Sequence, residues 1–412
     1  MQSLLILGRQ PELGIAELES IYGKDKLEIV NDKAVIVDVD PCLLTFKRLG
    51  GSLKFCKILT SLESRDWTEI EDFLIDAAPK QSTSMPEGKM KLGLSLIGFN
   101  RRPSAIMASG LKLKKAIQAT GRSVRLIPNK EAELNSAQVI HNGLCSPTGW
   151  ELVIIKGRDK TIVAQTVMVQ DIESYTLRDR QRPKRDAKVG MLPPKLAQII
   201  INLAVGEIPK DKLESICDIP ADKEIPQPNL GQTILDPFCG TGVVLQEALL
   251  MGYDVYGSDV MRRMVDYSKE NLAWLKKVYK LNDRDDKLEV LDATTTNWDG
   301  DFNFIASELF LGQPLSTVPQ TDKLNDVISE SNEITKQFLA SLATQIKSGF
   351  RLCIAVPAWQ IRQNEFKHLP LIDQISDLGY NRLSFERLGN DKLIYYRSDQ
   401  IVARELLLLT RK

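Results

Sequence analysis

Residues 234–259 read ILDPFCGTGVVLQEALLMGYDVYGSD, and this stretch decides the fold of the C-terminal half of the chain. Its first two residues are predicted to end a buried strand, which places Asp236 at the carboxyl tip of that strand. Gly240 and Gly242 follow, and glycine permits both a tight turn and a close approach of the backbone to a ligand. The segment therefore begins as a strand that leads into a ligand-binding turn.

A helix and a second strand complete this unit. Residues 243–251 contain no helix breaker, and residues 254–258 are predicted to return as a strand that leads to Asp259. Such a βαβ unit forms a crevice at the carboxyl ends of parallel strands, where nucleotide-type ligands bind. Leu245 stands where dinucleotide-binding enzymes carry their third glycine, so the turn reads G-x-G-x-x-L.

The acid before the turn indicates the ligand. Asp236 would repel a pyrophosphate and attract an ammonium group, and S-adenosylmethionine has an α-amino group and no phosphate. Asp259, 23 residues later, is placed to accept hydrogen bonds from ribose hydroxyls. We therefore predict that S-adenosylmethionine binds at Asp236, Phe238, Gly240, Gly242 and Asp259, although a βαβ unit without any ligand has the same layout.

A third strand is predicted over residues 288–291 and brings another acid to the same edge of the sheet. Asp292 follows it directly and could accept a hydrogen bond from the adenine amine, while Ala293 could supply a backbone N–H. An aspartate at this point could instead cap a turn. Its place behind Asp236 and Asp259 favours the cofactor role.

Length and composition limit the classes of protein. The 412-residue chain is too long for one ordinary core, so two or three domains are expected. Charged residues make up 26% and hydrophobic residues 43%, as in ordinary globular proteins, and no apolar stretch is long enough to span a membrane. The N-terminus reads as a strand without a basic leader, so we expect a cytoplasmic protein. The six cysteines form no C-x-x-C pair, which argues against a metal site.

Charge is balanced overall but not locally. Residues 88–130 contain no Asp or Glu, although the whole chain has 54 acidic and 54 basic residues. A solvated surface would explain an ordinary run of charge, but the missing acids favour a surface for RNA phosphates. The predicted RNA-binding residues are Arg101, Arg102, Lys112, Lys114, Lys115, Arg122 and Arg125.

The order of predicted elements suggests the organisation of the chain. Residues 2–60 alternate as strand, helix, strand, strand, helix and strand, which is the order of a ferredoxin-like split βαβ; its second helix is expected over residues 41–49. Residues 65–172 form a second α/β region, and a basic connector follows. From residue 231 onward, helices and strands alternate in a doubly wound sheet whose last two strands are antiparallel. Its last predicted helix covers residues 367–378 and its last two strands residues 381–388 and 405–409.

Three segments resemble one family. Residues 236–242, DPFCGTG, are similar to the first motif of the S-adenosylmethionine-dependent RNA methyltransferases that carry a THUMP domain, in particular the archaeal-type tRNA guanine-N2 methyltransferases and their bacterial relatives. Residues 7–20 resemble the opening strand and helix of these enzymes, and residues 134–142 resemble part of the THUMP domain. The resemblance implies four regions: a ferredoxin-like domain at 1–62, a THUMP domain at 63–172, a basic linker at 173–190, and a Rossmann-like methyltransferase domain at 191–412.

The same resemblance locates the catalytic loop. The fourth strand, predicted over residues 302–306, leads into SELFLG at residues 307–312, where amino methyltransferases of this class carry Asp/Asn-Pro-Pro-Tyr. In such a loop a carboxylate and a carbonyl bind the N–H groups of an exocyclic amine, which frees its lone pair, and an aromatic side chain stacks on the base. The resemblance makes Glu308 the acid, Phe310 the stacking ring and Ser307 the counterpart of the Asp/Asn.

The resemblance thus predicts methylation of the exocyclic N2 amine of guanosine in tRNA. Ribosomal RNA is an alternative substrate, and the THUMP-like region argues against DNA. Because both prolines of the catalytic loop are replaced, an RNA-binding protein that retains the cofactor fold without catalysis is the third alternative.

Overall fold

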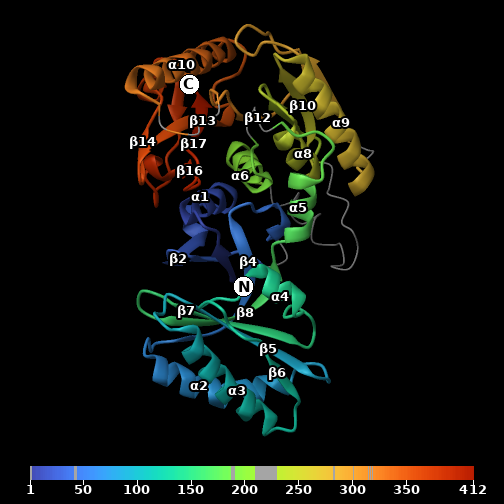
Figure 1. Cartoon of the computed structure of the whole chain (residues 1–412), viewed down its shortest axis with the longest axis vertical. Helices are drawn as coiled ribbons and strands as arrows, with labels where there is room; N and C mark the ends of the chain where they lie inside the picture. Colours follow the sequence, from blue (N-terminus) through green and yellow to red (C-terminus); the bar gives the residue numbers. More distant parts are fainter. Residues whose placement is uncertain are drawn as a thin grey trace. The chain divides into compact units, whose positions relative to one another are not determined.

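The computed structural model describes residues 2–40, 44–186, 191–208, 230–281, 284–299, 301–313, 315, 317 and 319–412 (Figure 1). The chain forms two compact units. The first unit contains residues 1–11, 25–47 and 52–172, and the second contains residues 12–24, 48–51 and 173–412. Each unit has its own sheet.

The first unit has an eight-stranded sheet in the order β2-β3-β1-β4-β8-β7-β5-β6. Its first four strands are antiparallel and follow the order 2-3-1-4, which is the order of the predicted ferredoxin-like arrangement. β4 pairs antiparallel with β8, so the strands of the two predicted N-terminal domains form one continuous sheet. The strands are β1 (Ser3–Leu7), β2 (Leu27–Asn31), β3 (Ala34–Val37), β4 (Ser52–Leu62), β5 (Met90–Ile97), β6 (Val124–Leu126), β7 (Gly149–Lys156) and β8 (Thr161–Val169).

Two helices pack on one face of this sheet (Figure 1). α2 (Trp67–Ser82) begins at Asp66, whose side chain accepts hydrogen bonds from the first turn of the helix. α3 (Pro103–Gln118) has a proline at its start, where no N–H donor is needed. Ile70, Leu74, Ile106, Leu113 and Ile117 from the two helices form a core with residues of β5 and β7. Both helices fall in the region predicted to be α/β, residues 65–172.

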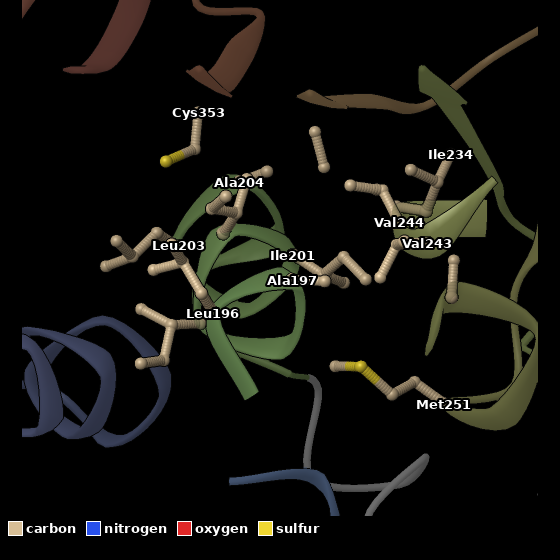
Figure 2. Packing of buried hydrophobic residues seen from close by; sticks show 14 of the residues in the cluster. Leu196, Ala197, Ile201, Leu203, Ala204, Ile234, Val243, Val244, Met251 and Cys353 are labelled. Atoms are coloured by element: carbon tan, nitrogen blue, oxygen red, sulfur yellow. The ribbon is translucent and has the colours of Figure 1, made fainter. Parts of the chain in front are cut away.

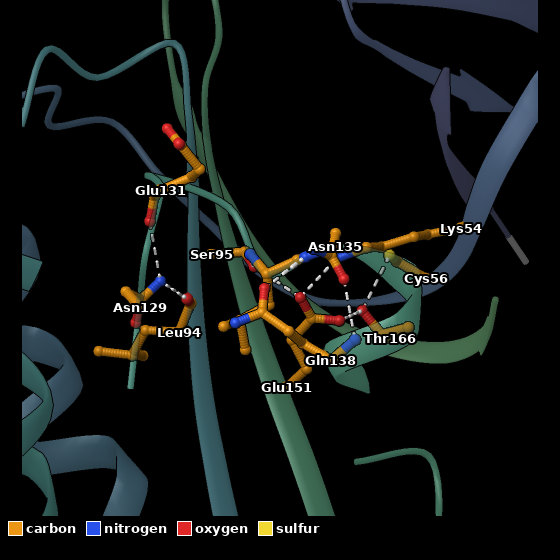
Figure 3. A network of polar contacts seen from close by, with 11 residues as sticks. Lys54, Cys56, Leu94, Ser95, Asn129, Glu131, Asn135, Gln138, Glu151 and Thr166 are labelled. Atoms are coloured by element: carbon orange, nitrogen blue, oxygen red, sulfur yellow. Dashed lines mark hydrogen bonds and ion pairs between the residues drawn. The ribbon is translucent and has the colours of Figure 1, made fainter. Parts of the chain in front are cut away.

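A buried polar network crosses the first unit (Figure 3). The fully buried Glu151 of β7 accepts hydrogen bonds from Lys54 Nζ at 2.5 Å, Ser95 Oγ at 2.5 Å and Thr166 Oγ1 at 2.6 Å. Lys54 also donates to the carbonyl of Leu134 at 2.7 Å, which ties a loop to the sheet. Since every carboxylate oxygen of Glu151 has a donor, the network is structural.

The second unit contains a nine-stranded sheet whose main path is β11-β10-β9-β12-β13-β17-β15. The first five of these strands are parallel, while β17 is antiparallel to both β13 and β15. The predicted doubly wound sheet with two antiparallel final strands is confirmed. The strands are β9 (Thr233–Asp236), β10 (Asp254–Asp259), β11 (Asp286–Val290), β12 (Phe304–Glu308), β13 (Arg351–Arg362), β14 (Glu365–Lys367), β15 (Tyr380–Arg382), β16 (Ile394–Tyr395) and β17 (Val402–Arg411).

Helices cover both faces of this sheet. α6 (Pro194–Val205), α8 (Val243–Leu250) and α9 (Arg262–Tyr279) contribute to one core, and α10 (Thr321–Ala343) contributes to the other. Side chains alternate between the faces, because Ile234 belongs to the first core and its neighbour Leu235 to the second. Figure 2 shows α6, from which Ala197 and Ile201 point toward Val243 and Val244 at the start of α8.

An N-terminal helix also belongs to the second unit. α1 (Pro11–Tyr22) carries Glu17, which is fully buried and accepts hydrogen bonds from Gly50 N at 2.9 Å, Gly51 N at 2.8 Å and Asn202 Nδ2 at 2.7 Å. Burial raises the pKa of Glu17 to about 7 despite these donors. Arg48 completes the contact, since its guanidinium donates to Asn202 Oδ1 at 3.1 Å and to the hydroxyl of Tyr253 at 3.0 Å.

The connector is attached to the second unit as far as it is described, and residues 187–190 of the predicted linker lie outside the described residues. α5 (Ile172–Arg180) brings Arg178 to the buried Glu247 of α8, with contacts of 2.6 and 3.2 Å. Asn271 of α9 joins the backbone N–H of Lys184, at 2.9 Å, to the carbonyl of Thr241, at 2.8 Å. The connector is thus linked to the glycine turn through the side chain of Asn271. The predicted domain boundaries at 62, 172 and 190 stay predictions.

Three elements differ from their predicted extent. Instead of a helix over 367–378 there is a 3₁₀ turn, η4 (Pro370–Gln374), because Pro370 delays the start and Gly379, with φ +86°, ends the segment. β15 is shorter than the strand predicted at 381–388. Of the helix predicted at 41–49, residues 41–43 lie outside the described residues and the rest contains only η3 (Phe46–Arg48).

One short helix and two more 3₁₀ turns complete the elements of the described residues. The remaining elements are α4 (Ser136–His141), η1 (Lys24–Lys26) and η5 (Asn390–Lys392). Asn135 and Gln138 form a reciprocal capping box at the start of α4. Among the described helices, none combines the length and the apolar character that crossing a membrane requires.

Candidate active site

A cavity of about 620 Å³ opens in the second unit at the carboxyl ends of the parallel strands. The chain order of the strands reverses between β9 and β12, and ligands of open α/β sheets bind at such a point. The cavity is lined by residues that directly follow or end β9, β10, β11 and β12, together with one face of α10.

The structure brings most of the predicted site residues together here. Eight of the ten predicted cofactor and catalytic residues line the cavity: Asp236, Phe238, Gly240, Asp259, Asp292, Ala293, Glu308 and Phe310. Gly242 and Ser307 do not line it.

Asp236 is buried at the tip of β9 and has no cationic partner among the described residues. Its Oδ1 accepts hydrogen bonds from Ser307 Oγ at 2.6 Å and from the backbone N–H of Phe238 at 3.3 Å. Burial is the main reason that its pKa rises to about 7, and the nearby Asp259 and Glu308 carboxylates raise it further. A cationic ligand group beside Asp236 would remove this penalty.

Asp259 holds the glycine turn in place. Its Oδ2 accepts from the backbone N–H of Gly240 at 3.1 Å and its Oδ1 from that of Met261 at 2.9 Å. Burial raises the pKa of Asp259, and the two N–H donors oppose this rise. Each carboxylate oxygen has a second lone pair, so Asp259 can still accept a hydrogen bond from a ligand hydroxyl.

Steric constraints explain why position 242 is a glycine. It precedes α8 with φ +82°, and a Cβ at this position would meet Ser268 Oγ at 2.9 Å and Ser268 Cβ at 3.2 Å. Both the left-handed backbone and the contact with α9 therefore exclude a side chain.

Replacing Gly242 with Ala tests this role. We expect a loss of about 2 kcal/mol, which lowers the melting temperature by several degrees in a thermal unfolding experiment. Gly231→Ala is the matched control, because Gly231 also has a positive φ, +59°, but no atom lies within 4 Å of the position that its Cβ would take. Equal losses in the two variants would show that the contact with Ser268 does not matter.

Asp292 has a local partner. Its Oδ1 accepts hydrogen bonds from the backbone N–H of Thr294 at 2.9 Å and the hydroxyl of Thr294 at 2.6 Å, so it does form the turn that was considered as its alternative role. It also lines the cavity beside the buried Ala293. The two roles are compatible because the second carboxylate oxygen is not used in these bonds.

Ser307 and Glu308 point in different directions at the end of β12, as neighbouring residues of a strand do. Ser307 is fully buried and donates to Asp236, so it orients the acid at the tip of β9 and does not reach the cavity. Glu308 lines the cavity, and its Oε1 accepts a hydrogen bond from Arg404 Nε at 2.8 Å. Sequence reasoning missed Arg404, which lies on β17 and has no motif around it.

The remaining wall has both polar and apolar residues. Glu330, Ile334 and Gln337 recur at helical spacing on α10, a pattern that could have identified them only once α10 was known to cover the site. Val260 and Met261 also line the cavity and are 66% and 42% exposed, so they offer an apolar surface to a planar ligand.

The charge of the cavity has one sign. Its described lining includes five carboxylates, of Asp236, Asp259, Asp292, Glu308 and Glu330, and neither Lys nor Arg. Such a cavity favours a cationic ligand and disfavours a phosphate. Size and polarity fit S-adenosylmethionine, which has a sulfonium, an ammonium, two ribose hydroxyls and a planar base.

The predicted RNA-binding residues lie in the first unit and divide into two groups. Arg101 stacks on the ring of Trp67 at 4.9 Å, Lys112 pairs with Glu71 at 2.8 Å, and Arg122 donates to the carbonyls of Ser82, Met85 and Pro86. These three stabilise the fold locally. The other four, Arg102, Lys114, Lys115 and Arg125, are exposed or half-exposed and available for phosphates.

Reversing two of the available charges tests their predicted role. We expect Lys115→Glu together with Arg125→Glu to weaken tRNA binding at least about tenfold and to reduce the slope of log affinity against log salt by about 2. The exposed Lys26 and Lys57 of the same unit, replaced in the same way, are the control. Equal losses in both double variants would point to a general charge effect rather than to this surface.

Part of the chain is similar to known proteins. Residues 225–372 match the family UPF0020, described as RMKL-like, methyltransferase domain. The tRNA (guanine(10)-N2)-dimethyltransferase of Methanothermobacter thermautotrophicus is 30% identical over 170 residues, which are 41% of this chain and 39% of that protein. The enzyme of the same name from Pyrococcus abyssi is 29% identical over 170 residues, 40% of this chain and 39% of that protein.

The matched length is limited, and the fold extends further. The chain spans about two fifths of the length of these curated relatives. The crystal structure of TrmN from Thermus thermophilus aligns over 100% of both chains with a TM-score of 0.50 and 13% identity, which is a likeness of fold.

Proposed function

We propose that this chain, whose residues 225–372 carry an RMKL-like methyltransferase domain, uses S-adenosylmethionine to methylate the exocyclic N2 amine of a guanosine in tRNA. One observation supports this proposal most directly. The cavity that fits the methyl donor also contains Glu308, a carboxylate that can bind the N–H of an acceptor amine.

The donor half of the cavity follows from the strand ends. Asp236 would hold the α-ammonium group, Asp259 the ribose hydroxyls, and Asp292 with the backbone of Ala293 the adenine edge. When bound, S-adenosylmethionine supplies a methyl group on a positively charged sulfur. Gly240 permits the backbone to lie close to the ligand, since it has a positive φ, +51°, and no neighbouring atom closer than 4.0 Å to a Cβ position.

The acceptor half lies at the end of β12. The lone pair of an aromatic amine is delocalised into the ring, so the amine is a poor nucleophile. Glu308 would accept a hydrogen bond from its N–H, which pulls the nitrogen toward the tetrahedral form and frees the lone pair. Phe310, which also lines the cavity, would stack on the base and hold its edge toward the donor.

The choice of RNA rests on the relatives. Both named proteins are tRNA (guanine(10)-N2)-dimethyltransferases, so guanosine 10 of tRNA is the first position to test. The four available cations of the first unit would contact the RNA backbone. A tRNA substrate also implies a cytoplasmic location.

A methyl-transfer assay tests the proposal. The purified chain is incubated with S-adenosylmethionine and unmodified tRNA, the RNA is digested, and the nucleosides are identified by mass. We expect N2-methylguanosine or its dimethyl form. Methylation of ribosomal RNA alone would change the substrate, whereas binding of cofactor and tRNA without any product from either RNA would support the alternative of a non-catalytic RNA-binding protein.

A further inference from the structure

Arg404 of β17 contacts the proposed acid from outside the catalytic loop. Its Nε donates to Glu308 Oε1 at 2.8 Å, and its Nη1 lies 3.5 Å from Gln400 Oε1. The side chains of Arg404 and Glu308 are only 8% and 16% exposed. The pair is therefore shielded from water, where an ion pair is stronger and better defined in direction than at a surface.

The sheet explains how residues 96 positions apart meet. Glu308 is paired with Ala355 of β13, while Arg404 is paired with Pro357 of the same strand. Ala355 and Pro357 are two residues apart and face the same side, so Arg404 and Glu308 also share that side. The side chains of Ala355 and Pro357 on this face are short, which leaves the long arginine room to cross β13.

The pair occupies the place of a missing constraint. In the RNA methyltransferase motif that residues 307–310 resemble, two prolines stiffen the loop, but Glu308 and Leu309 stand there instead. Among the described lining residues, the other charged groups of the cavity are carboxylates: Asp236, Asp259, Asp292 and Glu330. Without a cation, repulsion would turn Glu308 away from them.

We propose that Arg404 is a positioning residue, which holds one oxygen of Glu308 so that the other faces the acceptor amine. This inference rests on the proposed function. Arg404 replaces the rigid proline turn by an ion pair anchored on a different strand. Since a shift of about 1 Å in a reacting group can lower a rate about 100-fold, fixing the direction of Glu308 has a large kinetic effect.

The opposite face of β17 provides a matched control. Arg382 donates to Glu405 Oε1 at 2.9 Å, and these side chains are 20% and 3% exposed. Glu405 follows Arg404 directly and so faces the other side of the sheet, and neither residue of this second pair lines the cavity. Arg382→Gln thus removes a comparable ion pair without touching the proposed acid.

The experiment compares Arg404→Gln, Arg404→Lys and Arg382→Gln with the wild-type chain. We expect Arg404→Gln to lower kcat about 100-fold while KM for tRNA and Kd for S-adenosylmethionine change by less than about threefold. Arg404→Lys should recover part of kcat, because it restores the charge but not the direction of the donor. Arg382→Gln should keep kcat within about threefold of wild type, even if it lowers the melting temperature as much as Arg404→Gln does.

Three results would overturn the inference: an unchanged kcat in Arg404→Gln, a loss of cofactor binding in parallel with kcat, or an equal loss of kcat in Arg382→Gln. Failure of the proposed function is a separate outcome, in which wild type methylates no RNA. In that case the melting temperatures of Glu308→Gln, Arg404→Gln and the double variant show whether the two side chains are energetically coupled. Non-additive changes would support a pair that holds Glu308, and additive changes would exclude it.

Discussion

Asp236→Asn is expected to weaken S-adenosylmethionine binding on the order of 100-fold and, at the same time, to stabilise the cofactor-free protein. The first effect follows because Asn has no charge to offer an ammonium group, and losing a buried charge partner costs roughly 3 kcal/mol. The second follows because the carboxylate is buried without a cation, whereas Asn can still accept from Ser307 and Phe238.

The effect on stability depends on pH in a defined direction. The pKa of Asp236 rises from 3.8 to about 7 in the folded protein, so between these values the folded chain binds the proton and the unfolded chain does not. Stability therefore falls as pH rises through this window. We expect the variant to melt several degrees above wild type at pH 8 and to lose this advantage toward pH 4. Glu17, whose pKa is also raised to about 7, contributes equally to both proteins and cancels in the comparison.

Isothermal titration and thermal unfolding between pH 4 and pH 8 measure both effects. Wild-type affinity for S-adenosylmethionine should itself decline below about pH 7, as Asp236 takes up a proton. Asp254→Asn is the control, because Asp254 begins β10 at the opposite edge of the sheet and does not line the cavity. If Asp236→Asn bound S-adenosylmethionine as tightly as wild type, Asp236 would not be the group that binds the ammonium.

Glu308→Gln is expected to lower kcat about 1,000-fold while leaving S-adenosylmethionine affinity within about threefold. The amide has nearly the same size, but it is neutral and one of its two terminal groups is a donor, so it cannot favour the nucleophilic form of an amine. Single-turnover methyl transfer to saturating tRNA measures the rate of the chemical step directly.

Glu289→Gln is the comparison for this variant. Glu289 lies on β11 of the same sheet, accepts from the Tyr256 hydroxyl at 2.5 Å, and does not line the cavity. Its replacement should leave kcat within a few fold. If Glu308→Gln kept the wild-type rate, another group would have to bind the amine, and the resemblance of residues 307–310 to the catalytic loop would be misleading.

The sequence was most informative where one short segment builds one local structure. The turn at residues 236–242 and the acids at three strand ends were predictable, because strand, turn and helix signals are contiguous and parallel strands bring their carboxyl ends to one edge. The side of the sheet that each residue faces was harder to predict. Ser307 was expected in the catalytic loop, but strand alternation turns it to Asp236 and leaves Glu308 in the cavity.

Features that depend on distant partners were not predictable. Arg404 on β17 reaches Glu308 on β12 because only one strand, β13, lies between their two strands in the sheet. No local sequence pattern encodes this order of strands. The same holds for the basic run at 88–130, where Lys112 and Arg122 have structural partners on α2 and in the loop after it. A run of charged residues in a sequence indicates an exposed surface, but the fold decides which of these side chains form ion pairs or hydrogen bonds within the protein.

The burial of Glu17 has a consequence for how this architecture can be inherited. α1 and residues 48–51 pack within the second unit, where a Cβ on Gly50 would collide with the carbonyl of Lys195 at 2.0 Å. A recombination event that transplanted residues 173–412 into another gene would leave Asn202 and Tyr253 without Glu17 and Arg48. A transplanted gene fragment that encodes a whole second unit must therefore also include residues 12–24 and 48–51, which the chain supplies from among the segments of the first unit.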